Sequence, residues 1–140
     1  MLIGVPKEIK SDEYRIGLTP ESVEKLTQSG HEVMIEQNAG LGIGKDNKAY
    51  EDAGAEIVPT REEIFQRAEM IVKVKEPQLD ECALLRSDQI LFTYLHLAPD
   101  PEQVKALLAS GCRAIALSLI HISEPTRLGM ISYAVFCLKK

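Results

Sequence analysis

The sequence predicts a doubly wound α/β domain built on a mainly parallel sheet. Two short runs rich in Ile, Val, Leu, Phe and Tyr, 70–74 and 89–95, flank a charged segment of helix-like length. That order is the pattern of strand, helix, strand. Similar apolar runs alternate with capped, amphipathic segments along residues 1–117. Alternation of this kind is typical of parallel strands joined by helical crossovers.

The first half of the chain begins with a short strand. We expect it at Leu2–Val5, ended by Pro6 and followed by a polar connection over 7–18. Thr19 before Pro20 is typical of an N-cap and a first helical residue, and Gly30 is typical of a helix stop, so a helix is expected over 20–29. The next expected elements are a strand at 31–36, a loop at 40–44, a short helix from Asp46 to Gly54 and a strand at 55–58.

Two further helix starts are visible in the second half. Thr60 with Glu63 three residues later has the pattern of a capping box and predicts a helix there. Asp100-Pro101 repeats the cap-then-proline start, and Gly111 ends that helix. The remaining strands are expected at 70–74, 89–95 and 112–117, which makes six in all.

Composition excludes several classes of partner. The chain has 140 residues, 45% hydrophobic and 26% charged, which suits one globular domain with its own core. A net charge of -5 without a basic cluster gives no footprint for nucleic acid or anionic lipid. No signal-peptide pattern and no membrane-spanning run is visible. The three scattered cysteines suggest free thiols rather than a disulfide framework or a zinc site. We therefore expect a cytoplasmic protein without nucleic-acid, membrane or metal partners.

A glycine-rich loop invites a cofactor assignment that its spacing does not support. Gly40, Gly42 and Gly44 follow a predicted strand, but Lys45 stands where the dinucleotide fingerprint requires its third glycine. A structural turn is the favoured interpretation, because glycine adopts positive φ at little steric cost. We expect no cofactor-binding residues in this chain.

Three side chains follow predicted strands and form the candidate site. Arg15 follows the first strand, Lys75 the fourth and His96 the fifth. The carboxyl ends of parallel strands share one edge, so these groups are expected to converge there. Arginine pairs bidentately with a carboxylate, lysine can polarise a carbonyl oxygen, and histidine can exchange a proton. The pattern favours a small carboxylic acid as ligand. The alternative is a solvated loop arginine, a lysine paired with Glu76, and a structural histidine.

The same residues carry a family resemblance. The segments 4–8 (GVPKE), 13–20 (EYRIGLTP), 72–77 (VKVKEP) and 92–98 (FTYLHLA) resemble alanine dehydrogenases and the related pyridine nucleotide transhydrogenases. The resemblance covers 1–117. It implies a flavodoxin- or Rossmann-like substrate-binding domain of a two-domain dehydrogenase. It also implies reversible oxidative deamination of L-alanine to pyruvate and ammonia, with NAD held by a second domain, and a homohexamer when full length.

The resemblance assigns roles to the candidate residues. Arg15 and Lys75 would hold the carboxylate and carbonyl of pyruvate, and His96, with Lys75, would act in catalysis as the acid/base group. Asp12 stands where the family usually has Asn, and Gly17 where it usually has Ala. Two alternatives remain: the α-subunit N-terminal domain of a proton-translocating NAD(P) transhydrogenase, and a non-enzymatic module that binds small carboxylates. The dehydrogenase is preferred because the transhydrogenase counterparts of 75–77 and 95–96 differ.

The C-terminal stretch is expected to be unrelated to this domain. Residues 118–140 resemble translated sequencing-adapter sequence and contain neither a dinucleotide-binding loop nor the family's catalytic aspartate. The alternative is a natural strand or helix, since 130–138 is apolar. We expect the chain by itself to be inactive as a dehydrogenase, because the NAD-binding domain is missing.

Overall fold

The computed structural model describes residues 1–118 and 134–138, with side chains for 1–117. These residues form one sheet whose strands are β1 (Leu2–Val5), β2 (Glu32–Glu36), β3 (Glu56–Val58), β4 (Met70–Val72), β5 (Ile90–Thr93), β6 (Arg113–Ser118) and β7 (Ala134–Leu138). The strand order is β3-β2-β1-β4-β5-β6-β7. The first six strands are parallel to their neighbours, and β7 is antiparallel to β6. The predicted doubly wound, mainly parallel α/β fold is confirmed, and its first six strands have the Rossmann order.

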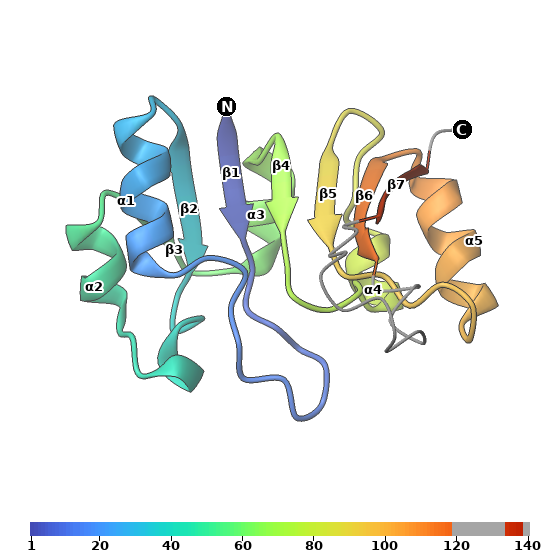
Figure 1. The fold of residues 1–140 in the computed structure, drawn as a ribbon, viewed down its shortest axis with the longest axis horizontal. Coiled ribbons are helices and arrows are strands. Elements are labelled where there is room, and N and C mark those ends of the chain that lie inside the picture. Colours follow the sequence, from blue (N-terminus) through green and yellow to red (C-terminus); the bar gives the residue numbers. More distant parts are fainter. Residues whose placement is uncertain (119–133, 139–140) are drawn as a thin grey trace, which may run out of the picture.

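Helices connect the strands, as Figure 1 shows. They are α1 (Pro20–Gln28), the 3₁₀ turn η1 (Leu41–Ile43), α2 (Asn47–Asp52), α3 (Arg61–Arg67), α4 (Leu79–Cys82) and α5 (Pro101–Ser110). The expected caps form: Thr19 accepts from the Ser22 N–H at 3.3 Å, and Asp100 accepts from the Gln103 N–H at 3.0 Å. Gly111 adopts a φ of 71°, which explains why α5 ends there.

The structure corrects the expected elements in three places. The capping box at α3 is only half formed: Thr60 accepts from the Glu63 N–H at 3.4 Å, but the Glu63 carboxylate pairs with Arg67 at 2.7 Å. β4 ends at Val72 rather than at residue 74. Its pairing with β1 reaches only Ile71, so the backbone beyond that point lacks a strand partner on one side. The charged segment between β4 and β5 forms a helix of only four residues, α4.

Two hydrophobic clusters lie on opposite faces of the sheet. Met34 packs in the cluster that contains Phe65 of α3, whereas its neighbours Val33 and Ile35 pack in the cluster that contains Tyr50 of α2. Adjacent strand residues point to opposite faces, so helices cover both sides of the sheet. Among the described residues, no helix is long and apolar enough to cross a bilayer.

The strand order reverses beside β1. The chain proceeds from β1 outward through β2 and β3, then returns to β4 on the other side and continues through β5 and β6. The carboxyl ends of β1 and β4 therefore flank the point where ligands bind in open α/β sheets. The long connection over 6–19 extends from this edge in Figure 1.

Candidate functional site

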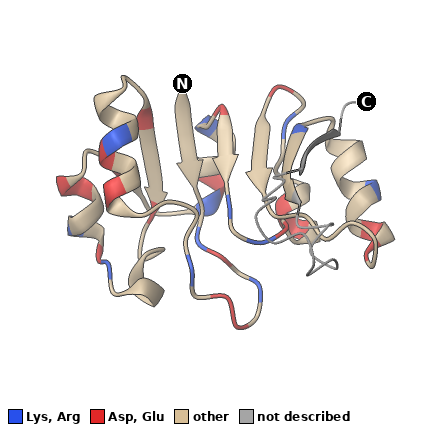
Figure 2. Cartoon of the chain, in the orientation of Figure 1, with Lys and Arg blue, Asp and Glu red and all other residues tan. Residues whose placement is uncertain are grey.

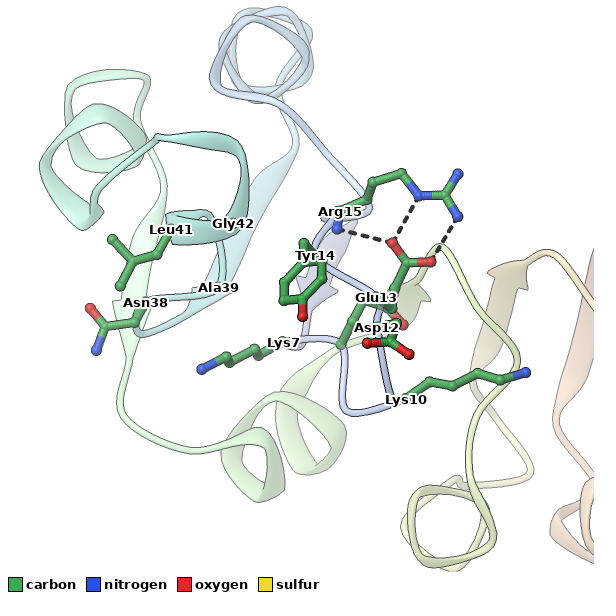
Figure 3. Close-up of a pocket in the computed structure, with 11 residues that line it drawn as sticks. Lys7, Lys10, Asp12, Glu13, Tyr14, Arg15, Asn38, Ala39, Leu41 and Gly42 are labelled. Atoms are coloured by element: carbon green, nitrogen blue, oxygen red, sulfur yellow. Dashed lines mark hydrogen bonds and ion pairs between the residues drawn. The ribbon is translucent and has the colours of Figure 1, made fainter.

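Arg15 lies in the connection after β1, where it forms a bidentate ion pair with Glu13. Its Nε donates to Glu13 Oε1 at 2.8 Å and its Nη2 donates to Oε2 at 2.7 Å. Figure 3 shows the two side chains facing each other. Arg15 is 62% exposed. Both residues line a cavity of about 300 Å³ whose other walls are Lys7, Glu8, Lys10, Asp12, Tyr14, Asn38, Ala39, Leu41 and Gly42.

The pKa shifts of Arg15 and Glu13 indicate which charged groups lie near this ion pair. The pKa of Glu13 is lowered to about 2, chiefly by the hydrogen bond from Arg15 and to a smaller extent by the positive charge of Lys75. The pKa of Arg15 is raised, chiefly by its hydrogen bond to Glu13 and also by the charges of Glu8 and Tyr94. Arg15 and Lys75 therefore act electrostatically on the same carboxylate. Figure 2 shows charges of both signs along this connection.

Lys75 is half-buried and follows β4 by three residues, since β4 ends at Val72. Its N–H donates to Glu8 Oε2 at 3.4 Å, and its carbonyl accepts from the Thr93 hydroxyl at 2.9 Å. The alternative interpretation from sequence, a pair between Lys75 and Glu76, is wrong, because Glu76 pairs with Lys10 instead. The ammonium group of Lys75 is thus not engaged by its neighbour in sequence.

His96 follows β5 by three residues, since β5 ends at Thr93, and it is exposed. Among the hydrogen bonds of residues 1–117, none involves the His96 ring. The structure therefore brings Arg15 and Lys75 to the reversal of the strand order. It leaves His96 after β5 at the same edge of the sheet, and within the described part of the chain no hydrogen bond joins its ring to either of them.

The sequence did not predict a buried ionic cluster of Lys73, Glu8 and Glu81, which lies next to Lys75 in the chain. Lys73 Nζ lies 3.2 Å from Glu8 Oε2 and 3.0 Å from Glu81 Oε1, and all three side chains are at most 1% exposed. Burial raises the pKa of Glu8, and the charge of Lys73 opposes that rise. A lysine within the apolar run 70–74 was the available signal, because a buried charge requires a partner. The pattern could not say which carboxylates would supply it.

The glycine-rich turn is filled by the protein itself. A side chain at Gly42 would overlap the carbonyl oxygen of Tyr14, and one at Gly40 would overlap the Tyr50 ring and the Lys45 carbonyl. Gly44 has a φ of 73°, which suits the predicted structural turn. The carbonyl oxygen of Tyr14, in the connection over 6–19, therefore blocks the close backbone approach that a pyrophosphate would need at Gly42. Over the described ranges, no cluster of three or more His, Cys, Asp or Glu side chains could hold a metal ion.

Comparison with known proteins places this chain in a family. The family described as alanine dehydrogenase/PNT, N-terminal domain, matches residues 4–134. The alanine dehydrogenase of Methanococcus maripaludis is 51% identical over 124 residues, which cover 89% of this chain and 33% of that protein. The alanine dehydrogenase of Bacillus subtilis is 50% identical over 86% of this chain and 32% of its own length. The chain thus spans about a third of these relatives.

Solved structures agree with the sequence relatives. An L-alanine dehydrogenase superimposes with a TM-score of 0.81 and 50% identity over 84% of this chain and 32% of its own. A transhydrogenase from Sinorhizobium meliloti gives a TM-score of 0.78 at 29% identity, over 84% of this chain and 33% of its own. Both branches therefore share the fold, and the dehydrogenase is nearer in sequence.

Proposed function

Because this chain belongs to the family of alanine dehydrogenase and PNT N-terminal domains, we propose that it is the substrate-binding part of an NAD-dependent L-alanine dehydrogenase. The complete enzyme would convert L-alanine reversibly to pyruvate and ammonia. The observation that carries this proposal is the approach of Arg15 and Lys75 to one edge, beside the reversal between β1 and β4. Two cations at such a point suit a small anionic ligand.

The geometry of Arg15 leaves one edge of its guanidinium for substrate. Glu13 occupies the Nε and Nη2 donors. The Nη1 and Nη2 hydrogens on the other edge can still form two parallel bonds to a carboxylate. We assign that edge to the substrate carboxylate and the Lys75 ammonium to the carbonyl oxygen, where a cation stabilises developing negative charge.

We assign His96 to proton exchange with the substrate, together with Lys75. Its exposed position at the carboxyl edge leaves the imidazole free to meet a ligand held by the two cations. Histidine is the side chain that most often transfers protons in general acid–base catalysis. The hydride acceptor, NAD, is proposed to bind the part of the enzyme that lies beyond the third spanned by this chain.

The transhydrogenase branch is the second candidate, supported by the structural likeness at 29% identity. The dehydrogenase is favoured because its structure is 50% identical, and because the segments that contain Lys75 and His96 resemble that branch. We further propose, on the family relationship alone, a homo-oligomer, such as the homohexamer implied by the resemblance, and a cytoplasmic location. The third candidate is a module that binds small carboxylates without catalysing a reaction. The same site would serve that function in the 140-residue chain by itself.

The division of the chain into residues 1–117 and an unrelated tail, 118–140, stays a proposal. The family match continues to residue 134, and β7, which lies in the tail, pairs with β6. Two interpretations of the tail therefore remain: a natural strand, and translated adapter sequence. The genomic sequence downstream of Leu117 distinguishes them, because an adapter read would be absent from it.

Calorimetric titration of pyruvate into the 140-residue chain tests the proposal. We expect saturable binding that R15A weakens strongly. The matched control is K105A, which removes one positive charge at an exposed position on α5, where Lys105 pairs with Glu102. Absence of pyruvate binding, or equal losses in R15A and K105A, would contradict the proposed site.

A further inference from the structure

The backbone before Lys75 is no longer paired with β1, although it follows directly from β4. β1 and β4 pair only through Ile3 with Met70 and Gly4 with Ile71. Beyond those pairs, the Glu8 carboxylate takes the place of the missing strand: Oε1 accepts from the Val74 N–H at 2.7 Å and Oε2 accepts from the Lys75 N–H at 3.4 Å. One side chain thus completes the ladder at the point where the strand order reverses.

The other side of the same segment is fixed by β5. The Tyr94 N–H donates to the Val74 carbonyl at 3.3 Å, and the Thr93 hydroxyl donates to the Lys75 carbonyl at 2.9 Å. Thr93 is fully buried. Lys75 is therefore held at its carbonyl by β5 and at its amide by Glu8, while its side chain extends from this clamp.

We propose that Glu8 is a positioning residue of the substrate site, whose carboxylate holds the Val74 and Lys75 amides and thereby sets where the Lys75 ammonium stands relative to Arg15. The inference rests on the proposed function, since it is a substrate bound between these two cations that would require their spacing to be fixed. Glu8 also lies close enough to Arg15 for its charge to act on that guanidinium. A misplaced binding group loses affinity steeply because hydrogen bonds weaken outside their narrow geometry.

The buried Lys73 ammonium balances the charge of the Glu8 carboxylate, which holds the Val74 and Lys75 amides. Glu8 and Glu81 share the single cation Lys73. The carboxylates differ in what else they contact: Glu81 Oε2 accepts from the Gln78 N–H at 2.9 Å at the start of α4, away from the Lys75 amide. Either carboxylate can be neutralised and still leave one balanced ion pair with Lys73. Neither change creates an unpaired buried charge, which is the costly outcome.

The experiment compares E8Q with E81Q in the 140-residue chain. Both remove one negative charge from the same lysine, but only E8Q disturbs the Val74 and Lys75 amides. We expect E8Q to weaken pyruvate binding about tenfold, because a displaced Lys75 ammonium would lose one charge-assisted contact with the substrate. E81Q should change the affinity less than about twofold. The Val74 and Lys75 amide signals in ¹⁵N–¹H spectra should move upfield in E8Q and stay in place in E81Q.

Hydrogen exchange of the unsubstituted chain gives a readout that needs neither variant nor ligand. Slow exchange of the Val74 and Lys75 amides is expected, and exchange at the rate of an open loop would overturn the clamp even if E8Q did not fold. Equal loss of pyruvate affinity in E8Q and E81Q would also overturn it, because a general weakening of the cluster would then explain both. If the unsubstituted chain bound no pyruvate, the proposed function would fail, while the amide signals would still decide whether the Glu8 carboxylate holds the Val74 and Lys75 amides.

Discussion

Replacement of Arg15 by alanine should weaken pyruvate binding far more than replacement of His96 does. The guanidinium edge that Glu13 leaves open offers two charge-assisted hydrogen bonds to a carboxylate that is present in the ground state. Such contacts contribute roughly 1.5 to 3 kcal/mol, which corresponds to about a ten- to hundredfold change in affinity. Because Arg15 is 62% exposed and water competes for it, we expect the lower end of that range.

The assay is steady-state kinetics of a full-length enzyme that carries residues 1–117. R15A should raise KM for pyruvate about tenfold at little cost to kcat, since a ground-state contact affects binding and the transition state alike. H96A should lower kcat by about 10² to 10⁴ with KM closer to normal, because general acid/base catalysis acts in the transition state. Near-normal KM in R15A, or near-normal kcat in H96A across pH 6 to 10, would refute the assigned roles.

Three further outcomes are expected. The 140-residue chain should show no saturable binding of NAD by calorimetry and no alanine-dependent NAD reduction, because the Tyr50 ring and the Lys45 carbonyl lie against Gly40 and the Tyr14 carbonyl lies against Gly42; saturable binding would reverse that interpretation. G42A should lower the free energy of unfolding by about 1 to 3 kcal/mol in urea, as overpacking against the Tyr14 carbonyl requires a backbone shift, and an unchanged midpoint would contradict the packing. The pKa of Glu13, lowered from 4.5 to about 2 chiefly by the hydrogen bond from Arg15, gives stability that is fully present above pH 4.5 and lost as the pH falls toward 2. The stability difference between the unsubstituted chain and E13Q should therefore be constant at pH 5 to 7 and shrink by pH 3, and a difference that stayed constant to pH 3 would argue against the ion pair.

Local signals determined most of the elements in the chain. Thr19-Pro20 and Asp100-Pro101 predicted the starts of α1 and α5, and Gly111 predicted the end of α5, because caps and stops depend on a few neighbouring residues. The parallel sheet followed from the alternation of apolar runs with helices. The position of Arg15 and Lys75 after their strands, together with a topology rule, was enough to predict that both would reach one edge.

Only the tertiary structure decided how those residues are held. Glu13 engages Arg15, and Glu8 reaches Lys73 and the Lys75 amide across 65 or more residues of sequence. A lysine in an apolar run, such as Lys73, indicates that a carboxylate partner is needed, but the sequence contains many Asp and Glu residues that could supply it. The choice among them depends on where the connection after β1 crosses to β4, and that path is set by the packing of the whole sheet rather than by any local pattern.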